Sequence, residues 1–210
     1  MTDIQRESPV FFKKAANRVE KRDNWTVALS YEDEKDPFIA DLSFKARFDV
    51  QSSSLSSIHP FGIKIPEKPG MSVFENGFLI NRMNQTQASI WHLTGDTPDM
   101  PEETAYTDVT EATLFLAVVG KEVFSIAEKL TRLDFLDPEK KAPFLFQGPF
   151  SHVNSQMVVF KSKTSLPGIL FTCARGYGQT MVEAVMAAGA EWDLSFAGEE
   201  RFVSWVETLE

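Results

Sequence analysis

The feature that most constrains the fold is a pair of apolar segments that each run into a helical pattern. Residues 114–119 form an unbroken apolar run, which is typical of a strand buried on both faces. Residues 121–133 repeat apolar side chains at three- and four-residue spacing, which predicts a helix. A second unit has a strand over 169–174 and a helix over 178–188 that ends at Gly189, a residue typical of the left-handed position past a helix end. Two strand-to-helix units favour an α+β fold.

Shorter strands are expected elsewhere, where apolar and polar residues alternate or where short apolar runs lie between turn residues. These strands cover residues 25–31, 38–50, 77–83, 88–93, 143–147 and 156–161. Residues 1–24 are polar, contain a basic stretch compatible with a helix, and are expected to form an arm. Proline and glycine spread through residues 60–70, and a connection of that length is expected to hold partner contacts or a linker between halves.

An internal echo suggests duplication. The spacing from Asp41 to Phe48 recurs from Asp108 to Phe115, and both stretches lead into apolar residues. Together with the expected strands, this echo predicts two related β-rich halves that share a sheet. The predicted organisation is an N-terminal arm at 1–24 and a single domain at 25–205, with halves at about 25–95 and 104–205.

Charge and cysteine content exclude several classes of protein. The net charge of −9 disfavours nucleic-acid binding, which generally uses a basic surface. Cys173 is the single cysteine, so the chain forms no internal disulfide and has no thiolate cluster for a metal, and a reducing compartment fits best. The N-terminal residues contain no apolar stretch of signal-peptide or membrane-span length, so we expect a cytoplasmic protein that does not contact a membrane.

The usual catalytic and metal-binding patterns are missing from the sequence. His59, His92 and His152 lie far apart and none has a second ligand at helical spacing, so we expect no metal site. His92 alternates with apolar neighbours and is expected on the polar face of a strand. Cys173 has no histidine near it in sequence, which gives no support to a covalent mechanism.

Two stretches admit a functional and a structural interpretation. Residues 175–178, Arg-Gly-Tyr-Gly, stand at a helix start and are either an anion-binding loop or a strand-to-helix turn that needs glycine flexibility. Asp108 is either a functional carboxylate at a strand entrance or a turn cap together with Thr110 and Glu111. We favour the structural interpretation of both.

The order of these features resembles the γ subunit of heterotetrameric sarcosine oxidase, within the wider superfamily of the folate-binding domain of the glycine cleavage T protein, an aminomethyltransferase. The residues that carry the resemblance are 39–48, 81–82, 90–93, 106–120 with the helix to 134, 178–189 and 191–202. The resemblance covers roughly residues 25–205. It implies an aminomethyltransferase-like fold in which helices pack on antiparallel or mixed sheets.

Departures from the T protein pattern determine the expected function. That family holds its pterin with an aspartate after a Gly-rich turn and an acidic residue in a Gly-Tyr-Thr-Gly-Glu loop. Residues 149–152 supply no paired aspartates, and residues 165–168 stand where the second loop belongs. The resemblance therefore implies a γ-type subunit with no catalytic residues of its own. Such a subunit serves a hetero-oligomeric flavoenzyme that oxidises sarcosine or a related N-methyl amine and transfers the one-carbon unit to tetrahydrofolate. FAD and FMN belong to larger partner subunits in this interpretation. We expect no cofactor on this chain, and tetrahydrofolate binding stays an open alternative.

Two alternatives stay open. The first is a free-standing tetrahydrofolate-dependent aminomethyl or methyl transferase, with Asp108 or Asp41 as the carboxylate near the substrate. The second is a folate-binding scaffold resembling proteins that assist iron–sulfur assembly. Its Lys-Gly-Cys-Tyr-x-Gly-Gln motif is missing here and only partly echoed by residues 176–179, so we rank it last.

Overall fold

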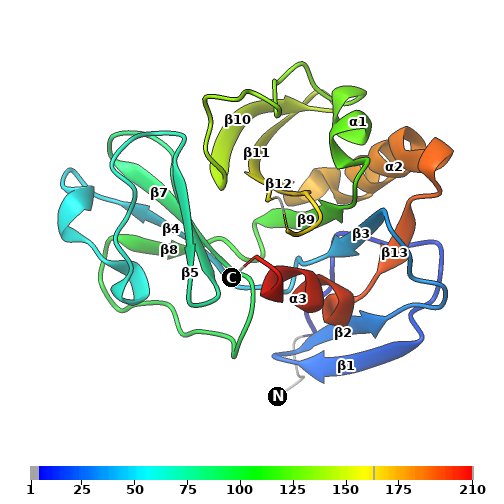
Figure 1. Ribbon diagram of the computed structural model, residues 1–210. Coiled ribbons are helices and arrows are strands. Elements are labelled where there is room, and N and C mark those ends of the chain that lie inside the picture. Colours follow the sequence, from blue (N-terminus) through cyan, green and yellow to red (C-terminus); the bar gives the residue numbers. More distant parts are fainter. Residues whose placement is uncertain (1–4, 163, 210) are drawn as a thin grey trace.

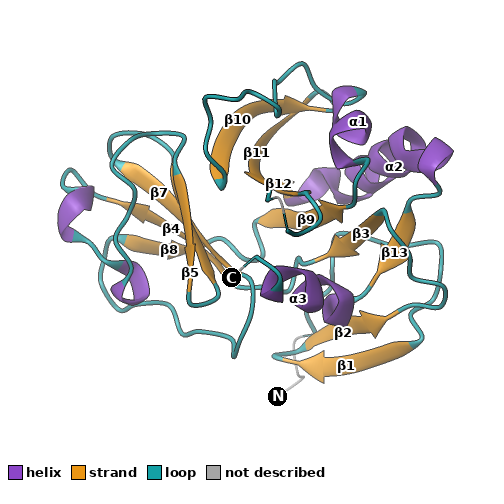
Figure 2. Ribbon diagram, viewed as in Figure 1, coloured by secondary structure: helices purple, strands orange, loops and turns teal. Residues whose placement is uncertain are grey.

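A computed structural model describes residues 5–162 and 164–209, and within these ranges strands make up most of the regular structure (Figure 2). The strands are β1 (Arg18–Arg22), β2 (Trp25–Ser30), β3 (Phe38–Asp41), β4 (Arg47–Gln51), β5 (Ser72–Glu75), β6 (Phe78–Arg82), β7 (Gln87–His92), β8 (Tyr106–Asp108), β9 (Thr113–Val119), β10 (Phe144–Phe150), β11 (Val153–Phe160), β12 (Gly168–Ala174) and β13 (Ser195–Ala197). The α-helices are α1 (Val123–Glu128), α2 (Gly178–Gly189) and α3 (Glu199–Glu207). The expected α+β class is confirmed.

A five-stranded antiparallel sheet in the order β5-β6-β7-β4-β8 lies on the left of Figure 1. One face is covered by the connection from β4 to β5, which contains two short 3₁₀ turns. Leu55, Ile63 and Ile65 of that connection are buried against Phe48 and Ile90 of the sheet. The expected linker between halves is therefore wrong, because both ends of the connection join strands of one sheet and its apolar residues complete that sheet's core.

A six-stranded sheet in the order β10-β11-β12-β9-β3-β13 forms the other large layer, and its β3–β13 pair is parallel while the others are antiparallel. Strand β9 lies inside this sheet and is buried on both faces. Successive side chains of a strand point to opposite faces, so its two sets of residues enter different cores. Leu114, Leu116 and Val118 belong to one core, and Phe115, Ala117 and Val119 belong to the other. This double burial explains the unbroken apolar run.

Helices cover both faces of the six-stranded sheet. Helices α1 and α2 pack on one face, and α3 packs on the opposite face beside the five-stranded sheet (Figure 1). Trp205 of α3 lies directly over Gly168 of β12, where an added Cβ would stand 2.4 Å from the indole Cζ2. Glycine is thus needed at that position for close packing. No helix within the described ranges is long and apolar enough to cross a membrane.

The expected sharing of a sheet by the two halves occurs in both large sheets. Strand β3 of the first half lies in the six-stranded sheet with strands of the second half, and β8 of the second half lies in the five-stranded sheet with strands of the first. The expected strand over 38–50 is broken at its centre, and its two parts, β3 and β4, belong to different sheets. A local turn causes the break, because the Asp41 carboxylate accepts the backbone N–H of Ser43 at 2.9 Å. The sheets still touch through the backbone, since the N–H of Leu145 donates to the carbonyl oxygen of Gly70 at 2.8 Å. The bounds of the two halves stay a prediction.

Helix α1 is shorter than the helix predicted over 121–133 and ends at Glu128. The β10–β11 hairpin takes the backbone groups just beyond it. The carbonyl oxygen of Leu130 accepts the N–H of Ser151 at 2.7 Å, and the Thr131 hydroxyl donates to the carbonyl oxygen of Pro149 at 2.8 Å. These tertiary contacts replace intrahelical hydrogen bonds, so the helix ends although the apolar periodicity of the sequence continues.

The expected arm contains a strand where we predicted a helix-compatible stretch. Strand β1 pairs antiparallel with β2, and the hairpin turns at Asp23 and Asn24, whose φ angles are 49° and 67°. Such a turn matches the twist of the flanking strands, and Asn and Asp tolerate left-handed backbone better than most residues. The charged pattern of β1 is that of an exposed edge strand, which is readily confused with a polar helix.

The glycine that ends α2 has a different role from the predicted one. Gly189 is right-handed, with φ −88°, and the left-handed residue is Asp193, with φ 52°. A Cβ on Gly189 would stand 2.6 Å from Cδ2 of Leu194. Glycine is required here because the chain folds back over the helix end and leaves no space for a side chain.

Candidate functional site

Two turns meet around Arg47, which is 1% exposed. One turn joins β3 to β4 and the other joins β8 to β9. The guanidinium donates to the carbonyl oxygens of Lys45 at 2.6 Å and Thr113 at 2.9 Å, and also to that of Thr110. Its Nε donates to Oγ1 of Thr113 at 2.9 Å. Arg47 therefore ties together the two places where the chain passes from one sheet to the other.

Arg47 forms no direct ion pair among the described residues. Burial lowers its pKa to about 9, and the negative charges of Asp41 and Asp108 oppose that shift. The guanidinium also lies 5.2 Å from the centre of the Phe115 ring. Because its N–H groups are directed at backbone carbonyls and Thr113, Arg47 holds the structure together and has no donor left for a ligand.

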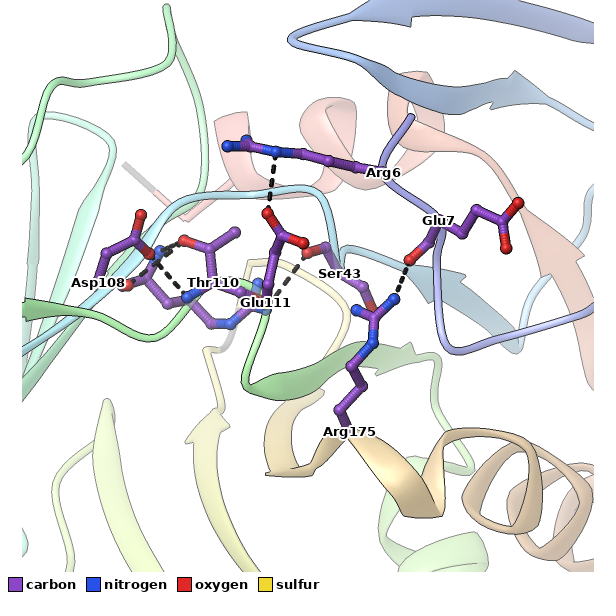
Figure 3. Close-up of polar contacts among 8 residues, drawn as sticks. Arg6, Glu7, Ser43, Asp108, Thr110, Glu111 and Arg175 are labelled. Carbon is purple, nitrogen blue, oxygen red and sulfur yellow. Dashed lines mark hydrogen bonds and ion pairs between the residues drawn. The ribbon is translucent and has the colours of Figure 1, made fainter. Parts of the chain in front are cut away.

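Asp108 caps a turn, as predicted. Its Oδ1 accepts the backbone N–H of Thr110 at 2.8 Å, and Oγ1 of Thr110 in turn accepts the backbone N–H of Arg47 at 3.0 Å (Figure 3). Glu111 does not join this cap, because its carboxylate pairs with Nε of Arg6 at 2.9 Å. The turn thus connects the N-terminal segment with the Arg47 cluster.

Asp41 and Asp108, the two carboxylates considered for a transferase, line different cavities. Asp41 accepts hydrogen bonds from the backbone N–H of Ser43 at 2.9 Å and from the hydroxyl of Ser8 at 2.5 Å. It borders a small cavity, and Asp108 borders a larger one. Trp25 and Phe44 line both cavities. The structure therefore does not bring the two carboxylates into one site.

The larger cavity, which we call the Asp108 cavity, lies between the N-terminal segment, the β3–β4 turn and the loop around residues 97–100. Its volume of about 420 Å³ falls in the range of small-molecule sites. Its charged lining consists of Asp23, Asp99 and Asp108 against Arg6. Since Arg6 already pairs with Glu111, the cavity is acidic. It suits a cationic or neutral polar group better than an anion.

The Arg175–Tyr177 segment forms a 3₁₀ turn between β12 and α2, which confirms the strand-to-helix turn. The Arg175 guanidinium donates to the carbonyl oxygen of Glu7 (Figure 3). An added Cβ on Gly178 would stand 2.4 Å from the carbonyl oxygen of Pro9. The glycine is needed for this close approach of the N-terminal segment, which covers the helix start that an anion would have to reach.

Cys173 and the histidines do not assemble into a reactive site. Burial raises the pKa of the Cys173 thiol to about 11, which disfavours the nucleophilic thiolate. His59 and His152 are exposed on separate turns. The described residues contain no group of three or more His, Cys, Asp or Glu that could hold a metal ion.

His92 is 3% exposed, so the expectation of a polar-face position is wrong. Its ring lies 5.3 Å from that of Phe78. Burial, with a smaller contribution from the charge of Lys45, lowers the pKa of His92 to about 4. Both faces of the sheet are covered, so alternation along β7 does not separate an inner from an outer face.

The buried imidazole predicts a loss of stability in mild acid. His92 stays neutral in the folded protein down to about pH 4, whereas in the unfolded chain it takes up a proton near pH 6.5. Between these values the unfolded state binds more protons, so stability falls as the pH falls. We expect His92 to cost about 2.5 kcal/mol at about pH 4.5 relative to pH 7. Urea unfolding at both pH values measures this cost.

Carboxylates also titrate in this range, so the comparison uses variants. His92→Gln has no group that titrates there and is expected to show a smaller loss of stability between the two pH values than the wild type. His59→Gln, at an exposed position, should behave like the wild type. Equal pH dependence of the wild type and His92→Gln contradicts the prediction.

Lys45 and Glu199 are also buried, and the sequence does not predict this. Nζ of Lys45 lies 2.5 Å from Oε1 of Glu199, and Nη2 of Arg22 lies 3.0 Å from Oε2 of the same carboxylate. Alternation through Phe44, Ala46 and Phe48 places Lys45 and Arg47 on an outer face, yet neither is exposed. Glu199 looks like an ordinary acidic residue in the first turn of a helix. No local signal distinguishes these residues from solvated ones.

Comparisons with known proteins give a likeness of fold. No protein-family model and no curated protein matches the chain. Among solved structures, it is similar to a chain of the heterotetrameric sarcosine oxidase from Corynebacterium sp. U-96 in complex with pyrrole 2-carboxylate, with a TM-score of 0.58 and 9% identity. The match covers 73% of this chain and 84% of that chain. The expected resemblance is confirmed at the level of the fold, while the γ-subunit assignment and the folate-binding domain stay predictions.

Proposed function

We propose that this chain is a non-catalytic, γ-type subunit of a hetero-oligomeric enzyme related to sarcosine oxidase. The observation that carries the proposal is the fold, which extends over 84% of a chain from a heterotetrameric enzyme of that kind. The sequence resemblance to the γ-subunit family points in the same direction. In this proposal the complex oxidises an N-methyl amine and passes the one-carbon unit to tetrahydrofolate.

The engagement of the candidate reactive groups supports a structural role. Asp108 caps a turn, Asp41 holds Ser8 and Ser43, and Arg175 binds the carbonyl oxygen of Glu7. Burial raises the pKa of the Cys173 thiol to about 11, which disfavours the reactive thiolate. The polar groups among these residues form hydrogen bonds within the chain, which fits a subunit that contributes shape and contact surface to a complex.

The cofactors of the proposed complex belong to partner chains. FAD and FMN are assigned to larger subunits, where the oxidation takes place. Tetrahydrofolate fits the Asp108 cavity poorly, because the glutamate tail of a folate is anionic and the cavity carries Asp23, Asp99 and Asp108. This charge also argues against the alternative of a free-standing folate-dependent transferase.

The test is affinity purification of the tagged chain from cells in which it occurs naturally, followed by visible absorbance of the eluate. We expect a larger chain to co-elute with the absorbance of a bound flavin. A tag on that larger chain should recover this protein in return. An untagged strain gives the background.

An eluate that contains this chain alone and has no flavin absorbance would contradict the proposal. Titration of that chain with tetrahydrofolate, with Asp108→Asn alongside, then tests the transferase alternative. Binding by the wild type that changes in Asp108→Asn supports the alternative and assigns the ligand to the Asp108 cavity.

A further inference from the structure

A second, smaller cavity lies beneath the N-terminal segment, between β2 and β3, with a volume of about 120 Å³. We call it the Asp41 cavity. Its lining includes four aromatic residues, Phe12, Trp25, Tyr31 and Phe44, and three small polar or acidic ones, Ser8, Thr26 and Asp41. It is distinct from the Asp108 cavity, although Trp25 and Phe44 line both.

The aromatic lining is held in place by its neighbours. The ring of Phe12 stacks on that of Phe196 at a centroid distance of 4.4 Å and meets the ring of Tyr31 at 5.8 Å. Trp25 is only 3% exposed. These packed rings border the cavity without having to be ordered by a ligand, which reduces the entropic cost of binding.

The carboxylate of Asp41 borders the same space without a cationic partner among the described residues. Both oxygens accept hydrogen bonds from neutral donors, Ser8 and Ser43. Arg47 provides a favourable field, but its guanidinium donates to carbonyl oxygens and Thr113 and forms no ion pair with Asp41. Burial raises the pKa of Asp41, and the bonds from Ser43 and Ser8 oppose the shift. A cation in the cavity would relieve this desolvated negative charge.

We propose that the Asp41 cavity binds a small alkylated ammonium ion, of the size of trimethylammonium, with its charge facing Asp41 and its methyl groups against the aromatic rings. Aromatic faces attract alkylammonium cations, and a carboxylate adds charge complementarity. The volume is somewhat smaller than that of a cavity of ~150 Å³ known to hold benzene, which leaves room for such an ion. An anion is repelled, and a neutral apolar molecule leaves the carboxylate uncompensated. The inference does not rest on the proposed function.

Isothermal titration of the full chain with trimethylammonium chloride tests the proposal, with sodium chloride at equal ionic strength as the reference. If the chain is isolated with a partner, the complex is titrated. Tert-butanol serves as the neutral probe of similar shape. We expect saturable binding of the cation and none of the alcohol at the same concentrations.

Three carboxamide variants assign the site. Asp41→Asn keeps the shape and removes the charge, and we expect it to weaken binding about tenfold or more. Asp33→Asn, at an exposed position, removes the same charge elsewhere and should leave the affinity unchanged. Asp108→Asn tests the neighbouring cavity and should also bind normally. Loss of binding in Asp108→Asn with retention in Asp41→Asn overturns the proposal.

A second variant keeps the test decisive if Asp41→Asn does not fold. Phe12→Leu keeps an apolar side chain at the wall but removes the aromatic face, and we expect affinity to fall severalfold. Absence of saturable binding by the wild type, binding of tert-butanol at similar affinity, or unchanged affinity in Phe12→Leu each contradicts an aromatic ammonium site.

Discussion

Replacing Glu199 by alanine is expected to destabilise the fold by about 3–5 kcal/mol. The carboxylate is buried, contacts Nζ of Lys45 at 2.5 Å and pairs with Arg22 at 3.0 Å. Burial acts to raise the pKa of Glu199, but the hydrogen bond from Arg22 and the charge of Lys45 outweigh it and lower the pKa. Burial also lowers the pKa of Lys45, and Glu199 opposes that shift. Without Glu199, an ammonium is left buried and uncompensated.

Chemical unfolding at neutral pH measures this loss, and the adjacent residue provides the control. Glu200 pairs with Arg18 at 2.9 Å, but both side chains are about half exposed. Glu200→Ala is therefore expected to cost about 1 kcal/mol or less. A double variant, Lys45→Met with Glu199→Leu, removes both charges and is expected to recover much of the stability. Glu199→Ala and Glu200→Ala of equal stability contradict the assignment of a buried network.

Replacing Arg47 by methionine is also expected to cause a large loss of folding stability. The change removes the donors to carbonyl oxygens of both turns and leaves buried acceptors such as those of Lys45 and Thr113 unsatisfied. Each unsatisfied group costs about 1–3 kcal/mol, so we expect a total loss of about 3–5 kcal/mol. A domain with ordinary stability of about 5–15 kcal/mol is left close to unfolding. Urea unfolding midpoints and the soluble yield report the change.

Two further variants make the result specific to Arg47. Arg47→Lys is expected to recover only part of the stability, because an ammonium cannot reproduce the planar fork of a guanidinium. Arg82→Met is the matched control, since Arg82 is also buried but donates to the carbonyl oxygens of a single loop, those of Asn84 at 2.6 Å and Gln85 at 2.7 Å. Equal costs for Arg47→Met and Arg82→Met contradict a special role in joining the two crossovers.

The candidate site shows where sequence reasoning succeeds. The turn-capping role of Asp108 is predicted correctly because its hydrogen bond to Thr110 is local, two residues away. The strand-to-helix turn at Arg175–Tyr177 is also local. Lys45 and Glu199 are separated by more than 150 residues, and no pattern in either neighbourhood reveals that they meet.

The helices and strands, like the site residues, are predicted correctly where local sequence decides them and incorrectly where distant contacts do. Strand β9 is predicted because burial on both faces demands an apolar residue at every position, and α2 is predicted because its periodicity and length exceed those of a strand. The end of α1 is missed because the β10–β11 hairpin, distant in sequence, takes the backbone groups beyond Glu128. The buried side of β7 is misjudged because a second layer covers the face that alternation assigns to solvent.

Short stretches of sequence are sufficient to predict the α+β class, most strands, the second strand-to-helix unit and the local turn at Asp108. These features depend on propensity, periodicity and hydrogen bonds between near neighbours, which are written in short stretches of chain. The burial of Arg47 and Glu199, and the position of Asp41 beside a cavity walled by Phe12 and Trp25, depend on tertiary structure. Burial and charge pairing arise only when distant segments exclude water together, so no local pattern encodes them.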